Sequence, residues 1–314
     1  MKPIAAFLRL IRSVNLLFIF ITQLLFQYAI IVPMFGETGM LSPALPLKHF
    51  LLLSLSSVLI AAAGYIINDY FDLNIDKINR PGKIVVEKAI RRRWAIVWHW
   101  VLSLAGVVIG FYVGWRASAF WLGFANAACV GALWFYSTTF KRKILSGNII
   151  ISLLTAWVVL VIGFVTHYRL VMHMDLYGFS FQSKLLRFTF LYAGFAFIIC
   201  LVREVVKDIE DMEGDAKYGC RTMPIVWGVN VSKVFAGTWL SVITATLIIV
   251  FAYILQFRWW VAATYCALLI ILPLINILIG LYRAKSIADY HRLSKWIKFV
   301  MFTGIVSMIF IWVK

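Results

Sequence analysis

The chain has 314 residues, of which 63% are hydrophobic and 14% are charged. Soluble domains average about 45–50% apolar and about 25% charged residues, so this composition excludes an ordinary water-soluble protein. The net charge of +17 does not indicate nucleic-acid binding, because the basic residues flank apolar segments instead of forming a soluble module. We therefore expect an integral membrane protein with no nucleic-acid partner.

Nine apolar stretches are long enough to cross a bilayer, which takes about 20 residues each. They are continuous rather than alternating, which favours helices over a β-barrel. In chain order they cover residues 13–33, 49–67, 94–115, 118–136, 148–167, 186–203, 233–256, 259–281 and 296–313. No linker divides them, so the sequence predicts one all-α polytopic membrane domain over residues 1–314.

The connections between these stretches differ in charge. Most of the 30 Lys and Arg residues lie before the first stretch or after the second, fourth, sixth and eighth. By the positive-inside rule, these connections and the N-terminus are cytoplasmic, and the C-terminus lies outside. The same basic residues are expected to contact anionic lipids of the cytoplasmic membrane.

Acidic residues are concentrated in two places: ten of the 13 fall in segments 68–93 and 203–222. Each segment carries aspartates at positions i, i+3 and i+7, which lie within about 60° on a helix and repel one another. Bound Mg²⁺ would compensate this charge, because it is a hard ion that bridges carboxylates and phosphates. We expect one ion at the first Asp series and one at the second, namely Asp69, Asp72 and Asp76, and Asp208, Asp211 and Asp215. The residues expected to be essential for reaction are Asp69, Asp72, Asp208 and Asp211.

The second and sixth stretches resemble each other, because each ends in an Asp series and a basic connection. This weak repeat predicts two related four-helix halves with the ninth helix added. The two Asp series would then face each other across a central cavity.

Cations suited to a diphosphate surround both series, since Arg offers phosphate a fork of donors and Lys offers a point charge. Arg80, Tyr136 and Lys141 also fit topology setting or an interfacial belt, so both interpretations stay open. The expected ligands of a prenyl diphosphate are Asn68, Arg80, Tyr136, Lys141, Arg203 and Lys207.

These residues form motifs that resemble the UbiA superfamily of intramembrane prenyltransferases. The matching motifs are Asn68-Asp69-x-x-Asp72-x-x-x-Asp76 with Asn79-Arg80-Pro81, Asp208-x-x-Asp211-x-x-x-Asp215 with Gly219-x-x-Thr222-x-Pro224, and Lys141 with Gly147-Asn148. The resemblance implies nine transmembrane helices around a central cavity, Mg²⁺, and transfer of a polyprenyl group from its diphosphate.

Within the superfamily, segments 68–81 and 203–215 resemble digeranylgeranylglyceryl phosphate synthases. That resemblance implies a geranylgeranyl donor and geranylgeranylglyceryl phosphate as acceptor. Residues 82–87 differ from the proline-rich loop typical of that group, so an aromatic acceptor of quinone or pigment synthesis stays open. A cation-coupled transporter is an alternative of another class, although its acids would lie near the bilayer midplane rather than at helix ends.

Overall fold

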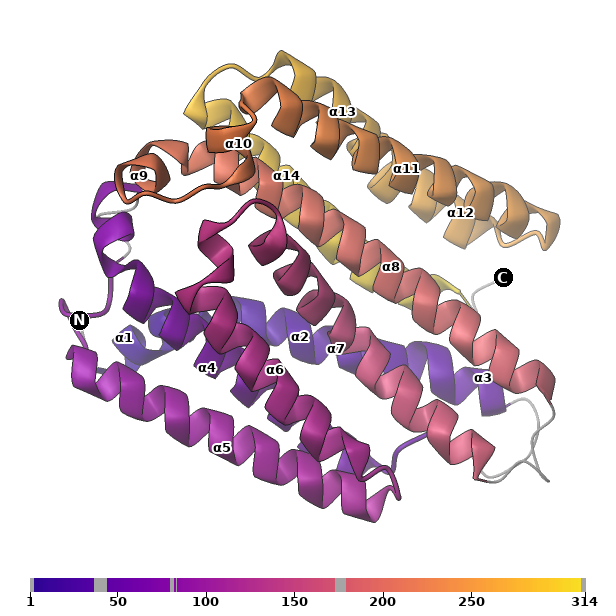
Figure 1. Ribbon diagram of the computed structural model, residues 1–314. Coiled ribbons are helices and arrows are strands. Elements are labelled where there is room, and N and C mark those ends of the chain that lie inside the picture. Colours follow the sequence, from indigo (N-terminus) through magenta and orange to yellow (C-terminus); the bar gives the residue numbers. More distant parts are fainter. Residues whose placement is uncertain (1–2, 37–43, 80–81, 83, 173–178, 312–314) are drawn as a thin grey trace.

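The computed structural model describes residues 3–36, 44–79, 82, 84–172 and 179–311. The described chain is nearly all helical, and its long helices run side by side (Figure 1). Eight of the described helices are long and apolar enough to cross a membrane. The protein is therefore an integral membrane protein, as its composition predicts.

The N-terminal part begins with the short helix α1, which is followed by a first span interrupted by a π-helical turn. Its elements are α1 (Pro3–Leu10), α2 (Ser13–Leu25), η1 (Phe26–Ile31), α3 (Val32–Gly36), α4 (Leu47–Asn79), α5 (Arg92–Arg116), α6 (Trp121–Thr138) and η2 (Phe140–Arg142).

The C-terminal part contains a second span with a π-helical turn, which ends two residues before Pro273. Proline lacks the backbone donor of a regular helix, so a locally altered hydrogen-bond pattern is expected there. Its elements are α7 (Ser146–Val171), α8 (Phe179–Glu210), α9 (Met212–Lys217), α10 (Met223–Val226), α11 (Val229–Gln256), α12 (Trp260–Cys266), η3 (Ala267–Ile271), α13 (Leu272–Arg283), α14 (Ile287–Val306) and η4 (Ser307–Phe310).

Eight predicted stretches coincide with the eight spanning helices, and the fourth, 118–136, coincides with α6. Helix α6 has only 18 residues, one of which is Asn126, and it ends in the polar residues Tyr136, Ser137 and Thr138. The last helix begins at Ile287, nine residues before the predicted start at 296. Its charged first turns are stabilised by a capping box between Ser286 and Asp289.

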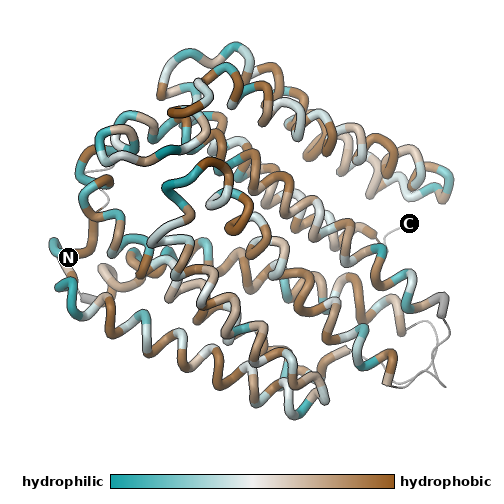
Figure 2. Tube along the Cα trace, in the orientation of Figure 1, coloured by the Kyte–Doolittle hydropathy of each residue, from teal (hydrophilic) through white to brown (hydrophobic). Residues whose placement is uncertain are grey.

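Large apolar side chains cover the outside of the long helices. Trp115, Leu104 and Ile249 have 67%, 66% and 70% of their surface exposed, which is typical of a surface that lies in lipid. Figure 2 shows hydrophobic residues along the middle of the helices and hydrophilic residues in the connections, above all near α1, α9 and α10.

Helix α8 takes part in both large cores of the molecule. Its first half packs with α7, η1 and α3, and its second half packs with α11, α13 and α14. Helix α9, which continues from α8, packs against the end of α4. This arrangement brings the ends of α4 and α8, where the two Asp series lie, to the same end of the bundle (Figure 1).

Candidate active site

One cavity of about 430 Å³ lies among α2, α4, α6, α7, α8 and α14 and reaches the charged ends of α4 and α8. It collects most of the side chains that the sequence singles out. The singled-out residues that line it are Asn68, Asp72, Asp76, Tyr136, Lys141, Arg203, Lys207, Asp208, Asp211 and Asp215.

Two of the singled-out residues are placed differently. Asp69 is not part of the cavity wall as described, and its Oδ1 accepts a hydrogen bond from Arg12 Nη2 at 2.6 Å. Arg12 joins α1 to α2 with a left-handed backbone (φ 51°), and its guanidinium lies 5.0 Å from the centre of the Tyr65 ring. Arg80 lies outside the described residues. The pairing of Arg12 with Asp69, a predicted metal ligand, could not be predicted from the sequence.

The second Asp series does not lie on one uninterrupted helix, which corrects the expectation from its spacing. The backbone departs from helical geometry at Asp211 (φ −93°, ψ 2°), between α8 and α9. Hydrogen bonds from Asp211 N to Lys207 O (2.8 Å) and from Asp215 N to Asp211 O (3.2 Å) continue across this bend. The i, i+4 register is thereby preserved, and all three aspartates of the series still line the cavity.

Asp72 is the best enclosed carboxylate of the first series, with 7% of its surface exposed. Lys141 in η2 forms an ion pair with Asp72 Oδ2 and donates to Asn68 Oδ1 at 3.3 Å. Asn68 Nδ2 also donates to Asp72 Oδ2 at 2.8 Å. A lysine and an amide thus hold this carboxylate in a defined orientation.

The second series has its own amide donor. Asn148 Nδ2 on α7 donates to Asp208 Oδ2 at 2.8 Å, so the pair repeats the Asn68–Asp72 contact of the first series. Asn148 enters the sequence argument only through the family motif and was not predicted as a site residue. The sequence feature that could have identified it is the position of Asn148 in the first turn of a spanning helix.

The cations on α8 are already paired with one carboxylate. Glu204 accepts hydrogen bonds from Arg203 Nη1 at 2.7 Å and from Lys207 Nζ at 3.5 Å. Glu204 therefore orients two potential phosphate ligands and offsets their charge within a span, where an unpaired charge is costly.

Asn79, the last residue of α4, ties the two acidic ends together. Its Nδ2 donates to Asp211 O at 3.1 Å, and its Oδ1 accepts from Gly214 N at 3.0 Å. A larger residue at position 214 would displace the Asn79 side chain, because an added Cβ would lie 2.2 Å from Asn79 Oδ1. The separation between the two Asp series is thus fixed by side-chain and backbone hydrogen bonds.

Asp215 lies among other carboxylates and is partly removed from water. Burial and the neighbouring Asp211 carboxylate raise the pKa of Asp215 to about 6. Within the described part of the chain, no three Asp, Glu, His or Cys side chains gather closely enough to hold a metal ion. Mg²⁺ is usually bound through one or two carboxylates together with water and substrate phosphates, so these residues fit an ion that binds with a diphosphate.

Gly147, at the start of α7, sets the position of Lys141. A Cβ at this glycine would lie 2.7 Å from Lys141 Cα and 3.0 Å from Phe140 O, and backbone atoms yield less readily than side chains. We expect Gly147→Ala to displace η2, to cost about 1–3 kcal/mol of stability, and to raise the KM for prenyl diphosphate about tenfold. Thermal unfolding and steady-state kinetics measure the two effects.

Gly131→Ala is the matched control for this prediction, because an added Cβ on α6 would meet no atom within 4 Å. This variant should keep the wild-type KM and melting temperature. A wild-type KM in Gly147→Ala would show that η2 adapts and that its position does not govern donor binding.

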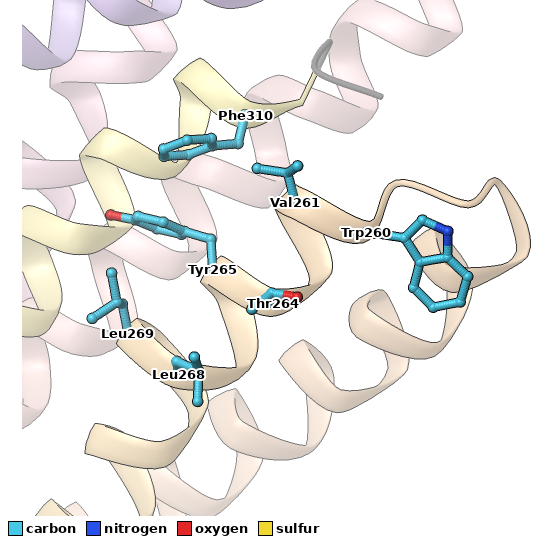
Figure 3. A pocket seen from close by; sticks show the side chains of 7 residues that line it. All are labelled: Trp260, Val261, Thr264, Tyr265, Leu268, Leu269 and Phe310. Atoms are coloured by element: carbon cyan, nitrogen blue, oxygen red, sulfur yellow. The ribbon is translucent and has the colours of Figure 1, made fainter.

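A second hollow lies far from the aspartates, on the outside of the bundle beside η4. It is an open groove of about 530 Å³, in which the rings of Tyr265 and Phe310 lie 4.5 Å apart (Figure 3). Among the described residues, its wall carries no charged side chain, and Thr264 and Tyr265 supply hydroxyl groups. Its composition fits contact with lipid tails and offers no chemistry.

Comparison with known proteins agrees with this geometry. Residues 13–306 match the model of the UbiA prenyltransferase family. A curated digeranylgeranylglyceryl phosphate synthase of Thermococcus sibiricus is 31% identical over 227 residues, which are 72% of this chain and 70% of the relative.

Two solved structures share the fold. One, from work on digeranylgeranylglyceryl phosphate synthase in membranes, has a TM-score of 0.61 and 24% identity, and the match covers 98% of this chain and 99% of the other. The other is a UbiA homologue from Archaeoglobus fulgidus bound to DMAPP and Mg²⁺, with a TM-score of 0.56 and 16% identity over 96% and 99% of the chains. The family model spans nearly the whole chain, and this protein belongs to the UbiA prenyltransferase family.

Proposed function

We propose that this prenyltransferase moves a geranylgeranyl group from its diphosphate to the hydroxyl of geranylgeranylglyceryl phosphate, with Mg²⁺ as cofactor. The observation that carries the proposal is a cavity with carboxylates, amides and lysines at one end and apolar side chains along the rest. The name of the Thermococcus relative supports the acceptor, and the DMAPP and Mg²⁺ bound to the Archaeoglobus homologue support the donor class and the metal.

The polar end of the cavity is suited to the diphosphate. Mg²⁺ ions would be held by the two Asp series, and they would supply charge neutralisation for the leaving group. Lys141 and Lys207 would contact diphosphate oxygens directly, as would Asn68. Arg80, Tyr136 and Arg203 stay predicted ligands of the diphosphate, and Asp69 would have to release Arg12 before it binds a metal.

The remainder of the cavity is suited to a long prenyl chain. Along α8 it extends from Tyr192 to Asp208, which is ~24 Å at the rise of a helix. The aromatic residues that line it are Phe18, Tyr65, Tyr136, Trp157, Tyr192 and Phe195. Their ring faces would stabilise an allylic cation, and the apolar wall would exclude water that would otherwise quench it.

The reaction consists of one bond exchange at C1 of the prenyl chain. The bond between C1 and the diphosphate oxygen breaks, and the electron pair leaves with the diphosphate, whose charge Lys141 and Lys207 offset. The acceptor oxygen then forms a bond to C1 and releases its proton to the departing diphosphate. The nucleophile belongs to the acceptor, so no serine, cysteine or histidine of the protein is needed.

The membrane arrangement is part of the same proposal. Helix α6 would be the ninth span, because it packs between α5 and α7 and its neighbours are spans. The halves α2–α6 and α7–α13 would be related, with α14 added. The unequal distribution of Lys and Arg supports a cytoplasmic N-terminus and cytoplasmic Asp series.

The first test uses purified protein in nanodiscs with Mg²⁺ and radiolabelled geranylgeranyl diphosphate. Geranylgeranylglyceryl phosphate and aromatic acids, including 4-hydroxybenzoate, are offered as competing acceptors, with EDTA as control. An ether-lipid product that EDTA prevents is expected. Product on an aromatic acid alone would refute the proposed acceptor and leave the prenyl-transfer chemistry intact.

A further inference from the structure

Lys298 lies on α14 in the wall of the cavity that holds the Asp series. It lies just inside the ninth apolar stretch, which begins at residue 296, and its hydrogen-bond partner Asn15 lies in the first turn of α2. A charged side chain in the wall of a cavity between membrane helices is costly unless a polar partner or ligand compensates it, and such residues often mark a substrate site. Lys298 is not among the residues expected to bind the diphosphate.

The contacts of Lys298 leave most of its binding capacity unused. Its Nζ donates to Asn15 Oδ1 at 3.0 Å and lies 5.3 Å from the centre of the Phe18 ring. Among the described residues, no carboxylate lies within ion-pair distance of it. An ammonium group has three donors, and one of them is used by Asn15.

The charged neighbours of Lys298 are other cations. Arg203 and Arg12 act on it electrostatically, and both line the same cavity. Arg12 is paired with Asp69 and the Nη1 of Arg203 with Glu204, but the Nε of Arg203 is buried with no hydrogen-bond partner. A buried donor of this kind is expected to have an acceptor when the site is filled. Lys298 Nζ thus has donors available for an anion in the cavity, and Arg203, which lines the same cavity, carries a further donor without a partner.

This cationic group lies deeper than the aspartates. Arg203 precedes Lys207 by about one helical turn on α8. Tyr65, whose ring lies 5.0 Å from the Arg12 guanidinium, precedes Asp69 by one turn and Asp72 by about two turns on α4. A diphosphate held by the Asp series would leave Lys298 Nζ vacant, and the Nε of Arg203 would stay available even if its other nitrogens contact the diphosphate. These donors therefore suit a second anionic group in the same cavity.

We propose that Lys298, held by Asn15 and assisted by Arg203 Nε, binds the phosphate monoester of the acceptor. The inference rests on the proposed function, whose acceptor carries both a hydroxyl to be prenylated and a phosphate. A phosphate dianion offers several oxygens to converging donors, and a lysine binds it as a point charge. Lys298 would therefore select phosphorylated acceptors and position their hydroxyl toward C1 of the donor.

The test compares two acceptors that differ only in the phosphate, geranylgeranylglyceryl phosphate and geranylgeranylglycerol. Kinetics are measured at saturating geranylgeranyl diphosphate and Mg²⁺ with full-length protein in nanodiscs. In Lys298→Met, the KM for the phosphorylated acceptor should rise about ten- to hundredfold, since a hydrogen bond to a charged group is lost. The KM for geranylgeranyl diphosphate and the kinetics with geranylgeranylglycerol should stay within twofold, and Lys298→Arg should restore most of the preference.

Lys295→Met is the matched control, because Lys295 is exposed on the same helix and does not line the cavity. If Lys298→Met is poorly folded, Lys298→Gln keeps a polar side chain at the position and is measured in the same way. A wild-type preference for the phosphate in these variants, or a rise in donor KM instead, would refute this inference alone. Absence of ether product from both acceptors with the wild-type protein would refute the proposed function and with it this inference.

Discussion

Asp211→Asn is expected to lower kcat for prenyl transfer by at least about a thousandfold while the protein stays folded. Neutralising one ligand of the second Asp series removes the charge that would hold Mg²⁺ on the diphosphate, and metal stabilisation of such a leaving group is worth several kcal/mol. The fold is expected to tolerate the change, because Asn79 contacts the backbone carbonyl of Asp211 rather than its side chain. Kinetics with geranylgeranyl diphosphate and thermal unfolding provide the two readouts.

Glu213→Gln is the control, because it makes the same charge change two residues away on an exposed side chain outside the cavity. It should retain turnover within twofold of wild type. Full turnover in Asp211→Asn would contradict the assignment of Asp211 as a metal ligand. It would indicate that Mg²⁺ is held by the first Asp series on α4.

Lys141→Met is expected to raise the KM for geranylgeranyl diphosphate at least about tenfold and to reduce kcat as well. It is also expected to destabilise the unliganded protein by about 3–5 kcal/mol, because it leaves the buried Asp72 carboxylate without its cation. Added Mg²⁺ should recover part of this stability by replacing the lost positive charge. Melting temperatures with and without Mg²⁺, together with kinetics, measure both effects.

Two further variants separate the binding role of Lys141 from its structural role. Lys141→Met combined with Asp72→Asn removes both charges and should recover the melting temperature without recovering transfer. Lys143→Met, at an exposed position whose ammonium lies 5.5 Å from the Phe140 ring, should leave both properties unchanged. Donor KM at the wild-type value in Lys141→Met would show that the lysine serves only to neutralise Asp72.

The spans and the two acidic ends could be predicted because their signals are local. A run of about 20 apolar residues is sufficient to identify a spanning helix, and aspartates at i, i+3 and i+7 share a face wherever the helix lies. Both helices are longer than the predicted apolar stretches, which end at residues 67 and 203, since α4 continues to Asn79 and α8 to Glu210. The first Asp series and the start of the second therefore lie on continuations of spanning helices.

Contacts between distant segments could not be predicted in the same way. Arg12 pairs with Asp69 across 57 positions, and Lys298 reaches Asn15 across 283. Each of these residues, taken alone, resembles a basic or polar residue at a membrane boundary. Their roles depend on which helices pack together, and the sequence periodicity of one helix does not specify its partners.

The bend at Asp211 shows a different limit. Nothing in the residue types of 208–215 excludes a continuous helix, and the helical hydrogen bonds do continue through the bend. The bend places Gly214 N and Asp211 O against the side chain of Asn79, which lies 132 positions earlier than Asp211. Tertiary hydrogen bonding therefore decides where α8 gives way to α9.

The contacts of Asn79 also divide the molecule into a stiff part and a compliant part. Because one side chain joins the end of α4 to both sides of the α8–α9 bend, the acidic mouth of the cavity keeps its width whatever occupies it. The opposite end, toward Tyr192 and Met308, is lined mainly by apolar and weakly polar side chains, whose contacts are less directional than hydrogen bonds. Prenyl chains of different length would accordingly be accommodated by movement at this apolar end, so that tail length and reaction geometry vary independently.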